Sequence, residues 1–152
     1  MLRHAEAETA PVDSERDLTA GGRRQTEALG RWMSDQGIAP ALFFSSAARR
    51  AQQTATICSG ASGYQGRIYF EDDLYDARIA AYTGIVTALD NSDDSVLIVG
   101  HNPEISATVA FFTGRLLTMS PCLLVCIEFA LEDWSSVQEG SGILKWVRTP
   151  DY

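Results

Sequence analysis

Residues 95–100 read Ser-Val-Leu-Ile-Val-Gly and lead directly into His101-Asn102-Pro103. A continuous apolar run with β-branched residues is typical of a strand that is buried on both faces of a parallel sheet. Pro103 suits the first turn of a helix, and we expect this helix to run to about Phe112. A buried strand followed by a helix is the repeating unit of α/β folds, so this stretch predicts the fold class.

The same alternation extends in both directions along the chain. We expect further strands at residues 1–3, 41–45 and 67–71, and a final strand hairpin at 122–131 and 142–148. Helices are expected after the N-caps Thr19 and Ser46, and from about Arg78 to Leu89. The prediction is a single three-layer α/β domain over residues 1–152, with a mostly parallel central sheet, helices on both faces and a C-terminal hairpin. The first strand is short against the usual length of about 5 residues. Either it is stunted, or residues that precede it are absent from this sequence.

Composition narrows the classes of function. The 152 residues are 45% hydrophobic and 21% charged, as in ordinary globular domains, and no apolar run approaches the roughly 20 residues of a membrane span. We recognise no signal peptide at the N-terminus. A net charge of −8 makes nucleic acid and anionic membranes poor partners. Three cysteines, Cys58, Cys122 and Cys126, fit a reducing cytoplasm better than a disulfide framework.

Residues that carry chemistry follow the ends of the predicted strands. In open α/β sheets, ligands bind beyond the carboxyl ends of the parallel strands. Arginine presents a rigid fork that grips two phosphate oxygens at once. The sequence therefore predicts an anion site at this edge, built from the groups that end the four parallel strands: Arg3-His4, residues 46–50, Asp72-Asp73 and Gly100-His101.

Four segments resemble motifs of the histidine phosphatase superfamily, which includes the phosphoglycerate mutases. Arg3-His4-Ala5 is similar to its signature, although Ala5 stands where glycine is often found. Residues 46–55 resemble its Ser-x-x-x-Arg-Ala-x-Gln-Thr helix, and residues 99–103 resemble its second histidine motif. Residues 13–19, followed by Gly22, resemble a segment of the SixA-type phosphohistidine phosphatases. The short chain favours this SixA-type branch over the mutases.

The resemblance implies a role for each matching residue. His4 is the implied phosphoryl acceptor and His101 its catalytic partner, while Arg3, Arg16, Arg50 and His101 bind the phosphoryl oxygens. Spacing selects Arg50 over Arg49, because only Arg50 lies four residues after Ser46 and directly before Ala-x-Gln-Thr. A neutral histidine nucleophile needs an acceptor on its other ring nitrogen. We expect a backbone carbonyl of the adjacent loop to be that acceptor.

The general acid is the least determined part of the predicted site. By resemblance, a carboxylate after the third strand protonates the leaving group, and Asp73 is the nearest match. Glu71, Asp72 and Asp76 are alternatives, and a solvated acidic turn without a catalytic role fits the sequence equally well. SixA-type proteins are thought to manage with a poorer acid, because a phosphoramidate P–N bond makes a different demand on the leaving group.

The predicted function is that of a cytoplasmic, metal-independent phosphatase that needs no cofactor and forms a covalent phosphohistidine at His4. Its expected partner is a phosphorylated substrate, foremost phosphohistidine in a protein such as a phosphorelay domain. A small-molecule phosphomonoesterase and a non-catalytic phosphate-binding regulatory module are the alternatives. A zinc site at His4 and His101 is disfavoured, because the nearby arginines would repel the ion.

Overall fold

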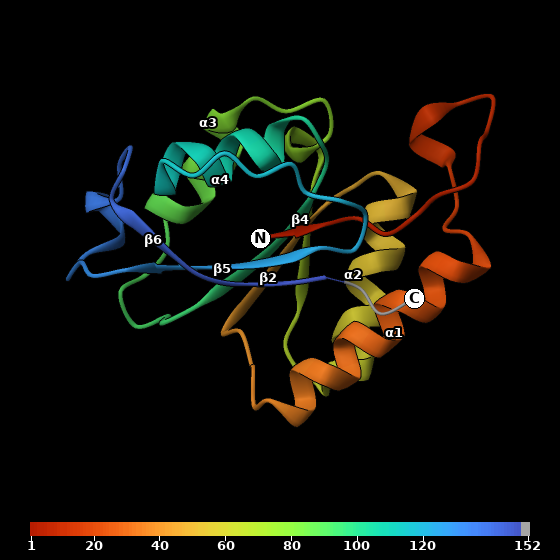
Figure 1. The fold of residues 1–152 in the computed structure, drawn as a ribbon, viewed down its shortest axis with the longest axis horizontal. Coiled ribbons are helices and arrows are strands. Elements are labelled where there is room, and N and C mark those ends of the chain that lie inside the picture. Colours follow the sequence, from red (N-terminus) through yellow and green to blue (C-terminus); the bar gives the residue numbers. More distant parts are fainter. Residues whose placement is uncertain (150–152) are drawn as a thin grey trace.

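Six strands form one sheet in the order β3-β2-β4-β1-β5-β6. The structure, shown in Figure 1, is a computed structural model that describes residues 1–149. Strands β1 to β4 run parallel, and β5 and β6 add an antiparallel edge. The predicted fold class is thereby confirmed, although residues 150–152 of the predicted domain lie outside the described residues. The strands are β1 (Leu2–Arg3), β2 (Leu42–Ser46), β3 (Ile68–Glu71), β4 (Val96–Gly100), β5 (Leu124–Phe129) and β6 (Gly142–Arg148).

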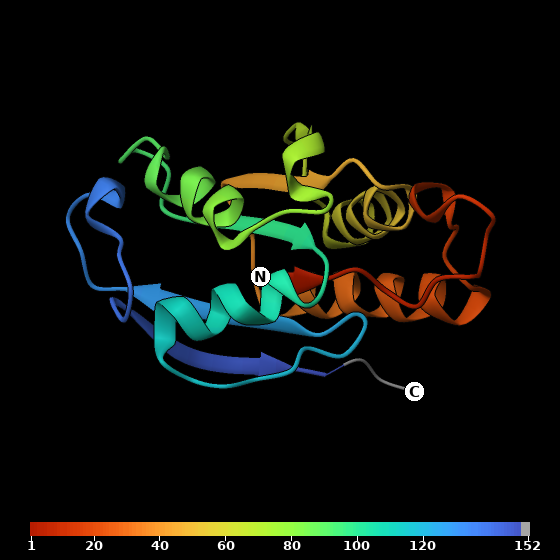
Figure 2. The same ribbon diagram turned by 90° about the horizontal axis from the view of Figure 1, so that it is seen from above.

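Helices cover both faces of this sheet (Figure 2). Successive side chains of a strand point to opposite faces, so Leu97 and Val99 of β4 join one core while Ile98 joins the other. The first core also contains buried residues of α1 and α2, and the second contains those of α3 and α4. The helices are α1 (Ala20–Asp35), α2 (Arg49–Ser62), α3 (Ile79–Thr87) and α4 (Glu104–Thr113), with short 3-10 helices η1 (Asp13–Glu15), η2 (Asp72–Leu74) and η3 (Trp134–Ser136). Within residues 1–149, the structure has no helix whose length and hydropathy would suit a membrane crossing.

Local capping chemistry explains where the first two helices begin. The Thr19 hydroxyl accepts a hydrogen bond from the Gly22 N–H at 2.9 Å, which confirms Thr19 as the N-cap of α1. The predicted cap of α2 is wrong, because Ala48 occupies the N-cap position and makes no side-chain capping bond. Ser46 lies instead at the end of β2, where its hydroxyl accepts a hydrogen bond from the Ala48 N–H at 3.2 Å. Its side chain is therefore available to the site described below.

The first strand, β1, contains two residues, and its pairing with β4 fixes its C-terminal end. β1 pairs with β4 through Leu2 opposite Val99 and Arg3 opposite Gly100. The His4 N–H then donates to the Gly100 carbonyl at 3.0 Å. This pairing holds the residues after β1 beside the residues after β4.

Candidate active site

His4 directly follows β1 and is almost fully buried, with 8% of its surface exposed. Its ring Nδ1 lies 2.7 Å from the Ala5 carbonyl oxygen. A carbonyl only accepts hydrogen bonds, so Nδ1 carries the ring proton and Nε2 carries the ring's lone pair. The predicted backbone acceptor is therefore present, and His4 has the tautomer that a nucleophile needs.

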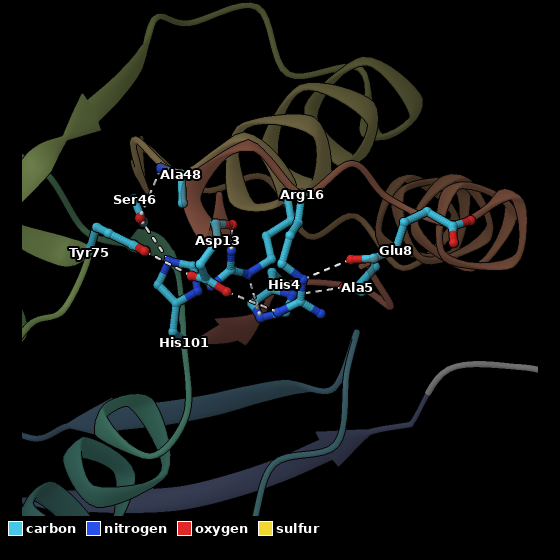
Figure 3. A network of polar contacts seen from close by, with 10 residues as sticks. His4, Ala5, Glu8, Asp13, Arg16, Ser46, Ala48, Tyr75 and His101 are labelled. Atoms are coloured by element: carbon cyan, nitrogen blue, oxygen red, sulfur yellow. Dashed lines mark hydrogen bonds and ion pairs between the residues drawn. The ribbon is translucent and has the colours of Figure 1, made fainter. Parts of the chain in front are cut away.

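His101 follows β4, and its ring centroid lies 5.0 Å from that of His4 (Figure 3). Its Nε2 is 2.8 Å from the Ser46 hydroxyl oxygen, and its backbone N–H donates to the Tyr82 hydroxyl at 3.1 Å. The two histidines, 97 residues apart in sequence, thus share one site because β1 and β4 are neighbours in the sheet.

Both imidazole rings are neutral at physiological pH. Burial lowers the pKa of His4 to about 4; the hydrogen bond to Ala5 opposes this effect, and the guanidiniums of Arg50, Arg3 and Arg16 add to it. Burial, followed by the proximity of His4 and Arg50, lowers the pKa of His101 to about 3. Removing a ring from water and placing positive charge beside it both disfavour the imidazolium form.

Arg50, in the first turn of α2, connects His4 to the loop that contains η1. Its Nε donates to His4 Nε2 at 3.3 Å, its Nη1 to the Asp13 carbonyl at 2.8 Å and its Nη2 to the Asp13 carboxylate at 3.1 Å. The neighbouring Arg49 is exposed, and its Nη1 lies 3.7 Å from the Asp17 carboxylate oxygen Oδ2. Arg50 thus lies at the site and Arg49 at the surface, as the motif spacing predicted.

The other two predicted arginines approach the cluster from different loops. Arg16 donates from Nη1 to Asp13 at 3.2 Å and from Nε to the Glu8 carbonyl at 2.7 Å. Arg3 donates from Nη1 to the Met119 carbonyl at 2.7 Å. Among residues 1–149, the buried side-chain nitrogens and oxygens without a hydrogen-bond partner are Arg3 Nε and His101 Nδ1. Two unsatisfied nitrogens therefore belong to residues of one small cluster.

Asp13 and Tyr75 complete the cluster, and the sequence predicted a role for neither. The Tyr75 hydroxyl donates to the Asp13 carboxylate at 2.8 Å and so bridges the loops of η1 and η2 (Figure 3). This bond, together with Arg16 and Arg50, lowers the pKa of Asp13 to about 2, so the carboxylate is ionised. Asp13 lies three residues before Arg16 in the SixA-like segment, which was the available signal. Nothing in the local sequence marks Tyr75.

Asp73 is the predicted residue that the structure does not join to the cluster. It lies exposed in η2, and within residues 1–149 its side chain makes no hydrogen bond or ion pair. The side chains of its alternatives Glu71, Asp72 and Asp76 likewise make none within that range. No group of three or more metal-binding side chains is gathered anywhere in the described part of the chain. The general acid stays a prediction.

Comparison with known proteins decides the family. The model of the histidine phosphatase superfamily (branch 1) matches residues 1–95. The chain belongs to the histidine phosphatase superfamily. The matched range contains His4, Arg16 and Arg50, while His101 lies beyond it and is brought to the site by β4.

Solved structures of this family share the whole fold. A protein histidine phosphatase SixA in complex with tungstate has a TM-score of 0.86 at 23% identity, covering 98% of this chain and 94% of that one. SixA candidate phosphohistidine phosphatases from Agrobacterium tumefaciens and Nakamurella multipartitia are each 26% identical over 98% of this chain. Their TM-scores are 0.84 and 0.82, and the match covers 95% and 93% of their own lengths. The predicted likeness to the SixA-type branch is confirmed.

One relative is recognised from sequence alone. An uncharacterized protein of Mycobacterium leprae is 29% identical over 103 residues. The aligned stretch is 68% of this chain and spans 62% of that relative's length.

Proposed function

We propose that this protein is a phosphatase that hydrolyses phosphohistidine in a protein, through a covalent phosphohistidine at its own His4. The observation that carries the proposal is the orientation of His4, whose Nδ1 is held by Ala5 while its Nε2 faces the Arg50 guanidinium. A neutral imidazole nitrogen beside fixed cationic donors suits attack on a phosphoryl group.

The geometry supports a two-step reaction. In the first step, His4 Nε2 forms a bond to phosphorus as the bond from phosphorus to the leaving nitrogen breaks, and the substrate imidazole, protonated on its other nitrogen, departs as a neutral ring. In the second step, the oxygen of a water molecule attacks phosphorus, the bond to Nε2 breaks, and inorganic phosphate departs with both hydrogens of the water, which leaves His4 neutral. Arg50, Arg3 and His101 would bind the outer oxygens, on which negative charge is spread in the transition state.

Tungstate, which a SixA structure contains, is a tetrahedral oxyanion like phosphate and fits a phosphoryl site for either a phosphoramidate or an ester. Two observations favour a phosphoramidate substrate. The chain is 26% identical to two SixA candidate phosphohistidine phosphatases of known structure. Asp13, whose carboxylate accepts a hydrogen bond from Arg50, is ionised and therefore cannot donate a proton to an alkoxide leaving group. The proposed partner is a phosphorelay protein, and the proposed compartment is the reducing cytoplasm, in keeping with three free cysteines.

A small-molecule phosphomonoesterase is the second candidate, and Asp73 is the observation that favours it. An exposed carboxylate lies in η2, two residues before the Tyr75 that contacts the cluster. A shift of this short segment on substrate binding would make Asp73 available as an acid. This candidate predicts that Asp73→Asn abolishes ester hydrolysis, whereas the leading proposal predicts that the same variant still dephosphorylates phosphohistidine.

The test is to trap phosphate on the enzyme. Labelled phosphohistidine protein and a panel of phosphate esters are incubated with the protein, and the reaction is stopped under alkaline conditions that preserve phosphohistidine. We expect label on the wild type with the phosphohistidine substrate, none on His4→Ala, and strongly reduced turnover in Arg50→Ala but not in the neighbouring control Arg49→Ala. Turnover of esters alone would refute the phosphohistidine proposal, and turnover by His4→Ala would refute the nucleophile. Phosphate binding without turnover would identify a non-catalytic module.

A further inference from the structure

His101 presents a ring nitrogen that nothing in the described chain satisfies. Only 6% of the residue is exposed, and its Nδ1 is buried without a hydrogen-bond partner among residues 1–149. The other ring nitrogen, Nε2, lies 2.8 Å from the Ser46 hydroxyl oxygen. The chemical behaviour of Nδ1 therefore depends on which of these two atoms, Nε2 or the hydroxyl oxygen, carries the shared hydrogen.

The surroundings of Ser46 decide this question. Ser46 is fully buried, and within the described residues its hydroxyl oxygen has two partners, the Ala48 N–H at 3.2 Å and His101 Nε2 at 2.8 Å. The amide can only donate, so one lone pair of the hydroxyl is occupied. If Nε2 also donated, the hydroxyl hydrogen would be buried with no acceptor. If the hydroxyl donates to Nε2, the Ser46 hydroxyl hydrogen and the Ala48 N–H both have partners, so this arrangement has the lower free energy.

We propose that Ser46 is a positioning residue that holds His101 in the tautomer with its hydrogen on Nδ1, so that the ring offers a neutral N–H donor to a phosphoryl oxygen. The proposal rests on the function proposed above, because it assigns the unsatisfied Nδ1 to the phosphoryl group. An N–H that lacks a partner in the unliganded protein gains one when the anion enters. An unsatisfied lone pair at the same place would repel the anion instead.

The two histidines thus use the same tautomer for opposite purposes. His4 donates its Nδ1 hydrogen to the Ala5 carbonyl, which leaves Nε2 as the nucleophile. His101 directs Nε2 at Ser46, which leaves the Nδ1 hydrogen for the substrate. The different roles of the two rings follow from two groups near strand ends: the Ala5 carbonyl beside His4 and the Ser46 hydroxyl beside His101.

The tautomer of His101 can be measured by NMR without a substrate. The chain contains two histidines, so a protein labelled with nitrogen-15 in its imidazole rings gives a simple long-range proton–nitrogen spectrum at neutral pH. A His4→Asn sample assigns the signals. We expect Nδ1 to carry the hydrogen in His101 of the unliganded wild type. A His101 ring that carries its hydrogen on Nε2 would overturn the proposal, whether or not the protein proves to be a phosphatase.

Variants then test the role of the hydroxyl. Ser46→Ala should lose the tautomer preference, weaken the binding of inorganic phosphate and lower kcat/KM by about tenfold, as expected for the loss of one intramolecular hydrogen bond. The matched control is Ser45→Ala, which removes the adjacent buried hydroxyl that donates to the Ser46 carbonyl at 2.9 Å and does not touch His101. We expect the control to keep both phosphate affinity and tautomer.

Thermal unfolding of each variant shows whether it is folded. Ser46→Cys, which keeps a weak donor of similar size, should restore part of the loss. Equal phosphate affinity in Ser46→Ala and wild type would overturn the proposal. An equal loss in Ser45→Ala and Ser46→Ala would do the same, because it would indicate a general effect on the strand.

Discussion

The neutral state of the two buried histidines should make the protein sensitive to mild acid. In the unfolded chain each ring has a pKa of about 6.5. In the folded protein burial lowers the pKa of His4 to about 4 and of His101 to about 3. Between these values and about 6.5, the unfolded chain binds more protons than the folded protein, so the free energy of unfolding falls as the pH falls.

The size of the effect can be estimated at about pH 5, where both folded rings are still neutral. Each histidine then favours the unfolded state by about 1.4 kcal/mol for every pH unit below 6.5, which gives about 2 kcal/mol per ring and about 4 kcal/mol for the pair. The result does not depend on the exact folded values as long as both remain below about 4.5. It is a large share of the 5–15 kcal/mol that stabilises a typical domain.

The assay is urea unfolding at about pH 7.5 and about pH 5, followed by the fluorescence of Trp32, Trp134 and Trp146. The matched control is the double variant His4→Asn/His101→Asn, which lacks both titrating rings. We expect the wild type to lose about 4 kcal/mol more than the control between the two pH values. Carboxylates titrate mostly below this range. The Met1 α-amino group, whose pKa burial lowers to about 6, titrates in both proteins and cancels.

Equal losses in the two proteins would refute the reasoning. Such a result would mean that the rings titrate as they do in water, and hence that they are not held neutral in a desolvated site. Each single variant should show about half of the effect, because removal of one ring leaves the other buried. The same neutrality predicts that kcat/KM stays level from neutral pH down to about 5 and falls only when His4 becomes protonated.

Three further predictions concern the anion pocket and the fold. Asp13→Asn should tighten the binding of inorganic phosphate by about fivefold, since it removes a half-exposed carboxylate that competes for Arg50. The control Asp17→Asn should leave phosphate affinity unchanged. Weaker phosphate binding by Asp13→Asn would mean that Asp13 positions the guanidinium of Arg50. Gly22→Ala should cost about 2 kcal/mol in urea unfolding, because its new Cβ would collide with the backbone of Glu6, while Gly60→Ala in open space on α2 should not destabilise. EDTA should leave phosphatase activity unchanged, because the site is lined by cationic guanidiniums that disfavour a metal ion; activity restored only by added metal would contradict this.

Several features of the site could be predicted from local rules. The apolar run at residues 95–100 indicated a central parallel strand, and the rule that ligands gather at carboxyl strand ends brought His4 and His101 together. The match to the family's Ser-x-x-x-Arg-Ala-x-Gln-Thr helix separated Arg50 from Arg49, and Arg50 lies beside His4 while Arg49 is exposed. Both inferences depend on short stretches of sequence, which can be read without the tertiary structure.

The sequence misjudged the residues whose role depends on a distant partner. Ser46 reads as a helix cap, yet its hydroxyl meets a ring 55 residues away. Asp13 reads as a loop residue, yet it accepts hydrogen bonds from Arg50 and from Tyr75, 62 residues away. Asp73 lies exposed in η2 and its side chain has no partner within residues 1–149, so its role as the acid stays a prediction.

The sequence by itself therefore indicated the likeness to the family, the alternation of strands and helices, and the position of His4 and His101 after neighbouring strands. Only the tertiary structure decided how these residues pair: which group lies beside each histidine nitrogen, which carboxylate binds Arg50, and which hydroxyl contacts His101. The physical reason is that periodicity and spacing act within one element. A hydrogen bond between side chains of different loops depends on the packing of both cores, which fixes the loops to within the length of that bond.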